Sequence, residues 1–219
     1  MGAPTRPADH AVLRSRAATR VLVTGFGRFP GAPVNPSGPL AHALAASRRL
    51  HGAQVRAVVL PTTWEQAARF GELLDSYDPD VVLMLGLAAR RRHVSIELFG
   101  RAATRLSPDA NRNRPASRRL VPEGPDLIAG TAPAAPLLHA LRHAHLRART
   151  SRDAGGYICN ALAYTAYGWA RAAGRRRTVV FVHIPRPRPG RVRMAALTRG
   201  LEALLVALVQ QHRRALRAA

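Results

Sequence analysis

The sequence predicts an α/β protein, a three-layer α/β/α sandwich around a twisted and mostly parallel central sheet. From Arg20 onward, short runs rich in β-branched residues alternate with longer segments of helical periodicity. This alternation is typical of a parallel sheet that is covered by helices on both faces. The chain has 219 residues, a length that suits one domain with a sizeable core. We therefore expect a single α/β domain over residues 21–219.

The expected strands are four short apolar runs, and the expected helices are five longer segments. Strands are predicted at 21–24, 55–60, 81–85 and 178–183, and helices at about 37–48, 63–76, 134–147, 160–172 and 193–217. The second helix should begin at a Thr-x-x-Glu capping box over 62–65. Residues 101–136 are rich in Pro, Asn, Asp, Ser and Arg and lack periodicity, so we expect a functional loop or a short hairpin there.

The chain is strongly basic, with a net charge of +22, and its 34 basic residues are all arginine. Such a charge favours binding to polyanions, because basic surfaces gain affinity by releasing phosphate counterions. Here the arginines are spread over short clusters, and only 5% of residues are aromatic and able to stack on bases. We expect a solvated basic surface and no nucleic-acid partner. A non-enzymatic polyanion-binding protein remains the alternative.

The expected location is the cytoplasm, with no membrane partner. Residues 1–20 contain no apolar run of seven residues, unlike a secretory signal, and are expected to form a flexible extension. The apolar stretch 201–209 is far shorter than the roughly 20 residues that span a bilayer. The single cysteine excludes an internal disulfide framework.

That cysteine, Cys159, lies where a reactive thiol is expected. It follows the pair Gly155-Gly156 and directly precedes a helical run. The N-terminus of a helix favours a thiolate and can lower the thiol pKa to about 3.5–7.5. The free N–H groups there can also form an oxyanion hole. On spacing alone, an inert buried cysteine is the alternative.

His183 is a candidate partner for this thiol, because it ends the last predicted strand. Parallel strands deliver such residues to the carboxyl edge of the sheet, where α/β active sites usually lie. A structural histidine bonded to the backbone fits the same pattern.

Two further motifs match known sites poorly. The segment 25–31 has the glycines of a dinucleotide fingerprint but neither the immediate helix nor the acidic residue of that motif. His139 and His143 have helical spacing but lack the glutamate of a zinc-protease motif. We therefore expect no cofactor and no metal.

Four blocks together resemble the pyroglutamyl peptidase I (pyrrolidone-carboxylate peptidase) family, in the family's order. VTGFGRF at 23–29 with VNPS at 34–37 is similar to the family's GF-x-PF…VNPS block, and GLAARRRHVSIE at 86–97 aligns without gaps to G-Q/L-A-G-G-R-x-x-I-[TS]-x-E. DAGGYICN at 153–160 is similar to AG-x-[YF]-[VIL]-C-N, and FVHIP at 181–185 to F-[IV]-H-[VIL]-P.

The resemblance implies a cysteine exopeptidase, an omega peptidase that hydrolyses the amide bond after an N-terminal pyroglutamyl residue through a thioester. It implies Cys159 as the nucleophile, His183 as the general base and Glu97 as the residue that orients the histidine. The implied partners are N-terminally pyroglutamylated peptides. Bacterial members of the family are commonly homo-oligomers, so a homo-oligomer is possible here too.

The resemblance also implies the walls of a pocket for the flat, neutral lactam of the substrate. Positions equivalent to Phe26, Phe29 and Tyr157 supply aromatic walls, and the backbone at Leu87, where the family often has glutamine, binds the lactam.

The chain departs from the family pattern at Ala89 and Arg90, which replace the usual pair of glycines. A cysteine hydrolase of the same fold that acts on a different small acyl-amide is therefore an alternative. The family's middle-loop arginine has two candidate matches, Arg105 and Ser107.

Overall fold

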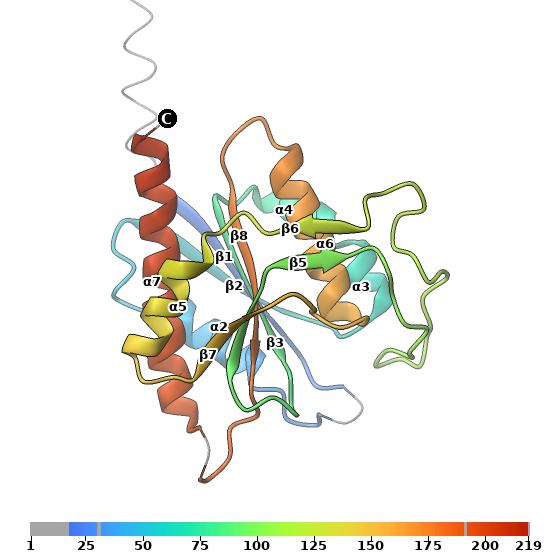
Figure 1. Cartoon of the computed structure of the whole chain (residues 1–219), viewed down its shortest axis with the longest axis horizontal. Helices are drawn as coiled ribbons and strands as arrows, with labels where there is room; N and C mark the ends of the chain where they lie inside the picture. The colour runs from blue at the N-terminus through green and yellow to red at the C-terminus, as the bar shows by residue number, and fades with distance from the viewer. Residues whose placement is uncertain (1–17, 30–31, 191, 219) are drawn as a thin grey trace, which may run out of the picture.

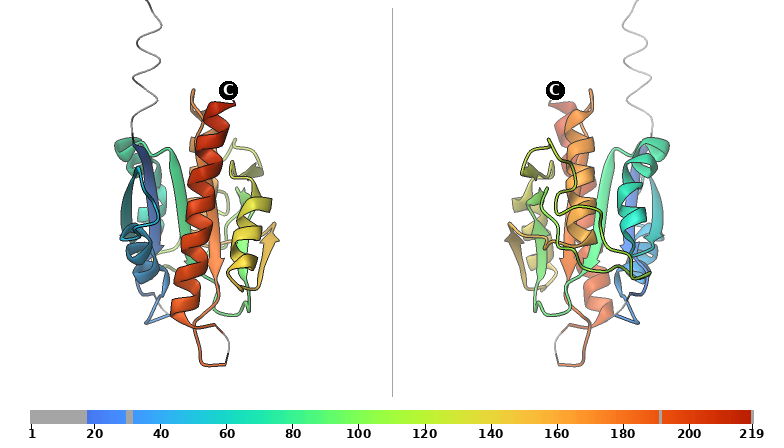
Figure 2. Two further views of the ribbon diagram at one scale, coloured as in Figure 1. Left: turned by 90° about the vertical axis from the view of Figure 1, so that its left-hand side faces the viewer. Right: turned by 90° about the vertical axis from the view of Figure 1, so that its right-hand side faces the viewer.

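The computed structural model describes residues 18–29, 32–190 and 192–218, and it has three layers, with a six-stranded sheet between two groups of helices (Figure 1). The side views of Figure 2 show helices on both faces of the sheet. The prediction of an α/β/α sandwich with a mostly parallel sheet is confirmed. The sequence predicts a flexible extension over residues 1–20. Residues 1–17 of this segment lie outside the described residues.

The central sheet has the strand order β2-β1-β3-β8-β4-β7. Its strands are β1 (Thr19–Phe26), β2 (Ala53–Leu60), β3 (Val81–Leu87), β4 (Val94–Glu97), β7 (Ala148–Ser151) and β8 (Thr178–Ile184). Neighbouring strands are parallel, except that β4 runs antiparallel to β8. A separate antiparallel pair consists of β5 (Phe99–Arg101) and β6 (Leu127–Ala129).

The helices of the described chain are α2 (Ser37–Ala45), α3 (Trp64–Ala68), α4 (Phe70–Tyr77), α5 (Ala134–His143), α6 (Ile158–Ala172) and α7 (Met194–Arg217). The helix expected over 63–76 is divided at Arg69 into α3 and α4. Its cap is also one residue later than expected: the Thr63 side chain accepts a hydrogen bond from the Gln66 backbone N–H at 3.2 Å, whereas the Thr62 hydroxyl is directed to the Gly27 carbonyl. In the described part of the chain, no helix combines the length and apolarity needed to cross a membrane.

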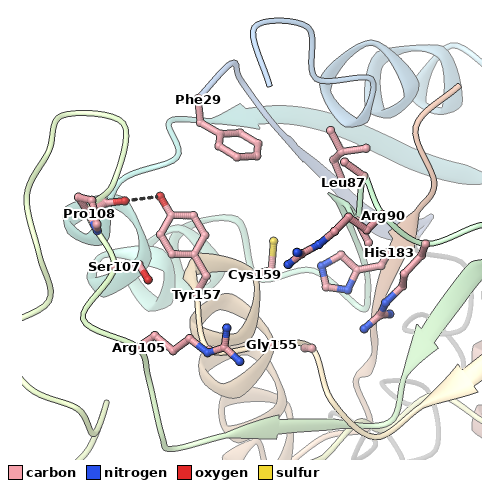
Figure 3. Close-up of a pocket in the computed structure, with 15 residues that line it drawn as sticks. Phe29, Leu87, Arg90, Arg105, Ser107, Pro108, Gly155, Tyr157, Cys159 and His183 are labelled. Atoms are coloured by element: carbon pink, nitrogen blue, oxygen red, sulfur yellow. Dashed lines mark hydrogen bonds between the residues drawn. The ribbon is translucent and has the colours of Figure 1, made fainter. Parts of the chain in front are cut away.

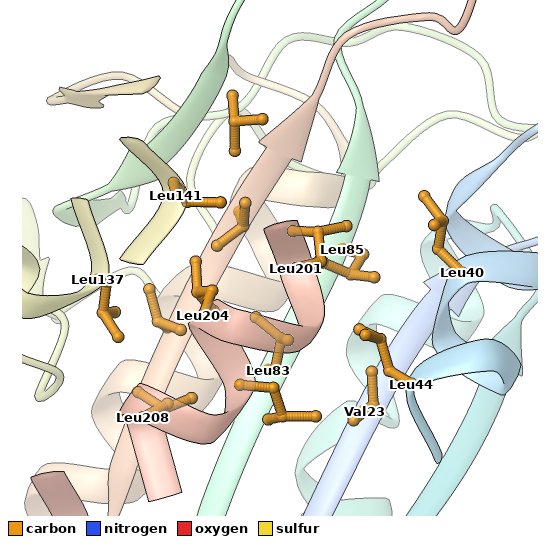
Figure 4. Close-up of a cluster of buried hydrophobic side chains, with 14 of the residues drawn as sticks. Val23, Leu40, Leu44, Leu83, Leu85, Leu137, Leu141, Leu201, Leu204 and Leu208 are labelled. Atoms are coloured by element: carbon orange, nitrogen blue, oxygen red, sulfur yellow. The ribbon is translucent and has the colours of Figure 1, made fainter. Parts of the chain in front are cut away.

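Alternating strand residues divide the core into one cluster on each face of the sheet. Val21 and Val23 of β1 lie in the cluster that α2, α5 and α7 cover (Figure 4), and Leu22 and Phe26 lie in the cluster that α3, α4 and α6 cover. This division follows from the period of two along a strand, which sends neighbouring side chains to opposite faces. The α6 side of the sheet is the side that carries the candidate site.

The short strand β5 holds the first turn of α6 in place. The Asn160 side chain accepts a hydrogen bond from the Arg101 N–H at 2.9 Å and donates one to the Arg101 carbonyl at 2.8 Å. Next to these two hydrogen bonds, a Cβ added at Gly100 would lie 2.4 Å from the backbone nitrogen of Tyr164. Only glycine therefore allows β5 to approach α6 so closely.

We expect Gly100→Ala to lower the free energy of unfolding by about 1–3 kcal/mol, because the added methyl group forces β5 and α6 apart. Urea unfolding followed by circular dichroism would measure the change. Gly174→Ala is the matched control: a Cβ there has open space around it, so this variant should stay within about 0.5 kcal/mol of the wild type. Equal stability of the two variants would show that the contact between β5 and α6 is loose.

Candidate active site

The three side chains expected to be catalytic lie on the α6 face of the sheet, at neighbouring positions. His183 is on β8 and Glu97 ends β4, the strand that pairs with β8 in antiparallel register. Cys159 is the second residue of α6, which packs on this face. Figure 3 shows the Cys159 thiol and the His183 ring side by side in one cavity.

Glu97 and His183 form a buried hydrogen-bonded pair. The distance from His183 Nδ1 to Glu97 Oε1 is 2.8 Å, and the two residues are 5% and 1% exposed. Burial disfavours ionisation of Glu97, but the hydrogen bond from His183 and the positive charge of Arg91 outweigh it, so the pKa of Glu97 lies below its usual value. An ionised carboxylate only accepts hydrogen bonds, so Nδ1 carries the proton. His183 Nε2 is thereby left free to act as a base.

Arg91 is a residue of the candidate site that the sequence analysis did not assign. Its Nη1 donates a hydrogen bond to Glu97 Oε1, and its Nη2 donates one to the Asp153 carbonyl at 2.8 Å. The guanidinium thus joins the carboxylate to the loop that precedes Cys159. Arg91 stands at the arginine of the family's G-G-R segment, which is the one sequence signal that pointed to it.

Gly86 makes room for the thiol. It pairs with His183 across β3 and β8, and a Cβ at this position would lie 3.0 Å from Cys159 Sγ and 2.7 Å from the Phe181 ring. The absence of a side chain at Gly86 lets the sulfur lie directly against the sheet.

The surroundings of the thiol raise its pKa, which is opposite in direction to the effect expected of the helix N-terminus. Burial and, to a smaller extent, the carboxylate of Glu97 raise the pKa of Cys159 to about 12, although a backbone hydrogen bond and the positive charge of Arg91 act in the opposite direction. The loss of hydration at the sulfur therefore exceeds the effect of the helix terminus. The sulfur needs a base to become nucleophilic, and the free nitrogen of His183 faces the same cavity.

A cavity of about 490 Å³ opens beside the thiol. Phe29, Leu87 and Tyr157 line it together with Cys159 and His183 (Figure 3). The Tyr157 hydroxyl donates a hydrogen bond to the Pro108 carbonyl at 3.1 Å, so the ring is held in the wall. The volume suits a small ligand.

Phe26, in contrast, does not line this cavity. It is 2% exposed and lies in the core cluster on the α6 side, near Trp64 and Leu60. As the last residue of β1 it continues the alternation of Leu22, so its ring is directed into the core. Trp64 stands one layer behind the cavity and contacts the Tyr157 ring edge to face, with 5.5 Å between ring centroids.

The positions that depart from the family pattern also lie in the cavity wall. Ala89 and Arg90 both line it, and neither has a positive φ. The backbone there does not require glycine, so the two side chains change the lining of the cavity and not the path of the chain. Arg105 and Ser107, the two candidates for the middle-loop arginine, both line the cavity, and the Arg105 N–H donates to the Gly156 carbonyl at 2.7 Å.

His139 and His143, which have helical spacing, lie on α5. The rings of His139 and His143 are 6.0 Å apart. Across residues 18–29, 32–190 and 192–218, no three histidine, cysteine, aspartate or glutamate side chains are grouped so that they could hold a metal ion.

Comparison with known proteins gives a consistent family assignment. The family model Peptidase_C15, described as pyroglutamyl peptidase, matches residues 19–197. A pyrrolidone-carboxylate peptidase of Streptococcus pyogenes serotype M5 is 29% identical in an alignment of 201 positions, which covers 87% of this chain and 92% of that protein. The crystal structure of a mutant pyrrolidone carboxyl peptidase from Pyrococcus furiosus has a TM-score of 0.81 and 25% identity, and it covers 88% of this chain and 99% of the other. The chain therefore belongs to the pyroglutamyl peptidase family of cysteine hydrolases.

Proposed function

We propose that this protein is a cysteine exopeptidase that removes an N-terminal pyroglutamyl residue from peptides, with Cys159 as nucleophile, His183 as general base and Glu97 as the residue that orients His183. The observation that carries the proposal is the 2.8 Å bond between His183 Nδ1 and Glu97 Oε1, beside the cavity that holds Cys159. The proposed partners are N-terminally pyroglutamylated peptides, and the proposed location is the cytoplasm.

Acylation begins when His183 Nε2 takes the proton from Cys159 Sγ. The thiolate attacks the carbonyl carbon of the pyroglutamyl residue, and negative charge develops on the carbonyl oxygen. The backbone N–H of Cys159 lies in the first turn of α6, where N–H groups lack an intrahelical partner, so it is positioned to stabilise this oxygen. His183 then gives its proton to the departing amine, the C–N bond breaks, and a thioester remains.

Deacylation repeats these steps with water. His183 Nε2 takes a proton from the water molecule as its oxygen attacks the thioester carbon. The C–S bond breaks, the Cys159 sulfur recovers a proton from His183, and free pyroglutamate leaves. Throughout both halves, Glu97 holds the Nδ1 proton and stabilises the imidazolium that forms twice in each cycle.

The cavity suits the pyroglutamyl ring, because this lactam is flat, uncharged and largely apolar. Phe29 and Tyr157 offer aromatic surface, and Leu87 offers aliphatic surface and backbone groups. No acidic side chain lines the cavity among the described residues, so a free α-amino group finds no counter-charge there. An N-terminal glutamine that has not cyclised should therefore be a poor substrate.

A panel of fluorogenic amides tests the proposal. The purified, reduced protein should release the fluorophore from a pyroglutamyl amide and leave the glutaminyl, prolyl and acetyl amides uncleaved. Hydrolysis of another acyl-amide in place of the pyroglutamyl one would favour the alternative specificity that Ala89 and Arg90 suggest. A folded protein that cleaves none of the four would contradict the proposal.

A further inference from the structure

The cavity that holds Cys159 is lined by three arginines and, among the described residues, by no acidic side chain. Arg91 is engaged with Glu97 and the Asp153 carbonyl. The guanidinium groups of Arg90 and Arg105 make no hydrogen bond or ion pair with other described residues. Two guanidinium groups therefore remain available to a ligand in the cavity.

An unpaired arginine is common in this chain, because 34 arginines face only 12 acidic residues. What distinguishes Arg90 and Arg105 is their position in the wall of a concave site beside the candidate nucleophile. Low-dielectric walls focus the electric field of such groups and attract anions to the cavity. The pyroglutamyl ring is uncharged, so it does not account for these two cations.

The mechanism indicates which part of the substrate meets the arginines. His183 must give its proton to the departing amine, so the leaving residue lies on the His183 side of Cys159. Figure 3 shows the Arg90 side chain next to His183 and Cys159. It shows Arg105 near Gly155 and below Tyr157, away from Phe29. The Phe29 side of the cavity suits the lactam, and the His183 side, where Arg90 lies, suits the leaving residue.

We propose that Arg90, assisted by Arg105, binds a carboxylate of the leaving group, so that this enzyme prefers pyroglutamyl substrates with an acidic group close to the scissile bond. Guanidinium matches carboxylate geometry with two parallel hydrogen bonds. The carboxylate can come from an aspartate or glutamate side chain at the second position or from the free C-terminus of a pyroglutamyl dipeptide. This inference rests on the proposed function and adds the chemical class of its substrate.

Two matched substrate pairs separate these sources of the carboxylate. The first pair is pyroglutamyl-glutamate amide against pyroglutamyl-glutamine amide, and the second is pyroglutamyl-alanine with a free C-terminus against its C-terminal amide. For at least one pair we expect kcat/KM to be about fivefold or more higher for the acidic member, as for a partly exposed ion pair of good geometry. Added salt should reduce the ratio, because it screens exposed charges.

Arg90→Gln tests the assignment directly, with Arg92→Gln as its matched control. Both variants remove one positive charge from an exposed side chain at neighbouring positions, but only Arg90 is among the residues that line this cavity. The ratio of kcat/KM between acidic and neutral members should fall toward one in Arg90→Gln and stay at the wild-type value in Arg92→Gln. Arg105→Gln should lower the ratio by a smaller factor.

The results that would overturn the carboxylate subsite differ from those that would overturn the proposed function. Equal turnover of acidic and neutral members by the wild type overturns the carboxylate subsite and leaves the pyroglutamyl activity intact. An equal fall of the ratio in Arg90→Gln and Arg92→Gln also overturns it, because the preference then comes from the overall surface charge. A folded wild type that cleaves neither pair overturns the proposed function, and the subsite with it.

Discussion

Replacing Cys159 by serine is expected to lower kcat/KM for pyroglutamyl amides by about 10⁴-fold or more. Loss of the nucleophile in a hydrolase that works through a covalent intermediate typically has an effect of this size. A hydroxyl is a far weaker acid than a thiol, and the site that serine would occupy already disfavours the anion: burial raises the pKa of Cys159 itself to about 12. Initial rates at high enzyme concentration would measure the residual activity.

The thermal midpoint serves as the control for this variant. Oxygen is smaller than sulfur and the two side chains otherwise have the same shape, so Cys159→Ser should unfold within a few degrees of the wild type. Because the chain has a single cysteine, complete alkylation by iodoacetamide should inactivate the wild type at one equivalent of label. A serine variant that keeps more than about one hundredth of the activity would show that the reaction does not pass through a thioester on this residue.

Glu97→Gln is the second change with a large expected effect, a loss of about 10²–10⁴-fold in kcat with a much smaller change in KM. A neutral amide cannot stabilise the imidazolium, and its NH₂ group can turn to His183 Nδ1 and select the tautomer with the proton on Nε2. That tautomer cannot take a proton from Cys159. Stopped-time assays over a range of substrate concentrations separate the two constants, and a variant with more than a tenth of wild-type kcat would contradict the role of Glu97.

The pH dependence of the free energy of unfolding tests the ionisation of Glu97 independently of activity. The pKa of Glu97 is lowered in the folded protein, so its ionised form contributes stability above the ordinary glutamate pKa of about 4.3. This contribution is lost as the pH falls through the lowered value. Urea unfolding of wild type and Glu97→Gln should therefore show the wild type more stable near neutral pH, and the difference should shrink in acid.

The longer elements were predictable from the sequence because their signals are local. Each of the four expected strands is present and extends the predicted range by one to four residues in total, and the long helix α7 begins within one residue of its prediction. Strands β4, β5, β6 and β7 were missed because each has only three or four residues, too few to show a period. Their pairing depends on the neighbours that the fold brings to them.

The candidate site was predictable in part. Cys159 and His183 stand out by their positions at a helix start and a strand end, whereas Glu97 came only from the family resemblance, since it ends one of the missed strands. The resemblance placed Phe26 in the pocket wall, whereas the alternation along β1 directs its ring into the core of the structure. The contact of Arg91 with Glu97 depends on the turn between β3 and β4, which no sequence period describes.

The division of the core by the central sheet has a consequence for how this enzyme tolerates change. Cys159, Glu97 and His183 all lie on the α6 side, while α2, α5 and α7 pack on the other face through their own cluster of aliphatic side chains. The sheet thus separates the face that carries the candidate catalytic residues from the face that carries only core packing. Hydrophobic substitutions in the cluster under α2, α5 and α7 should be tolerated as long as the total side-chain volume of the cluster is conserved. Engineering for thermal stability should therefore begin at α7, where it is least able to disturb the reaction.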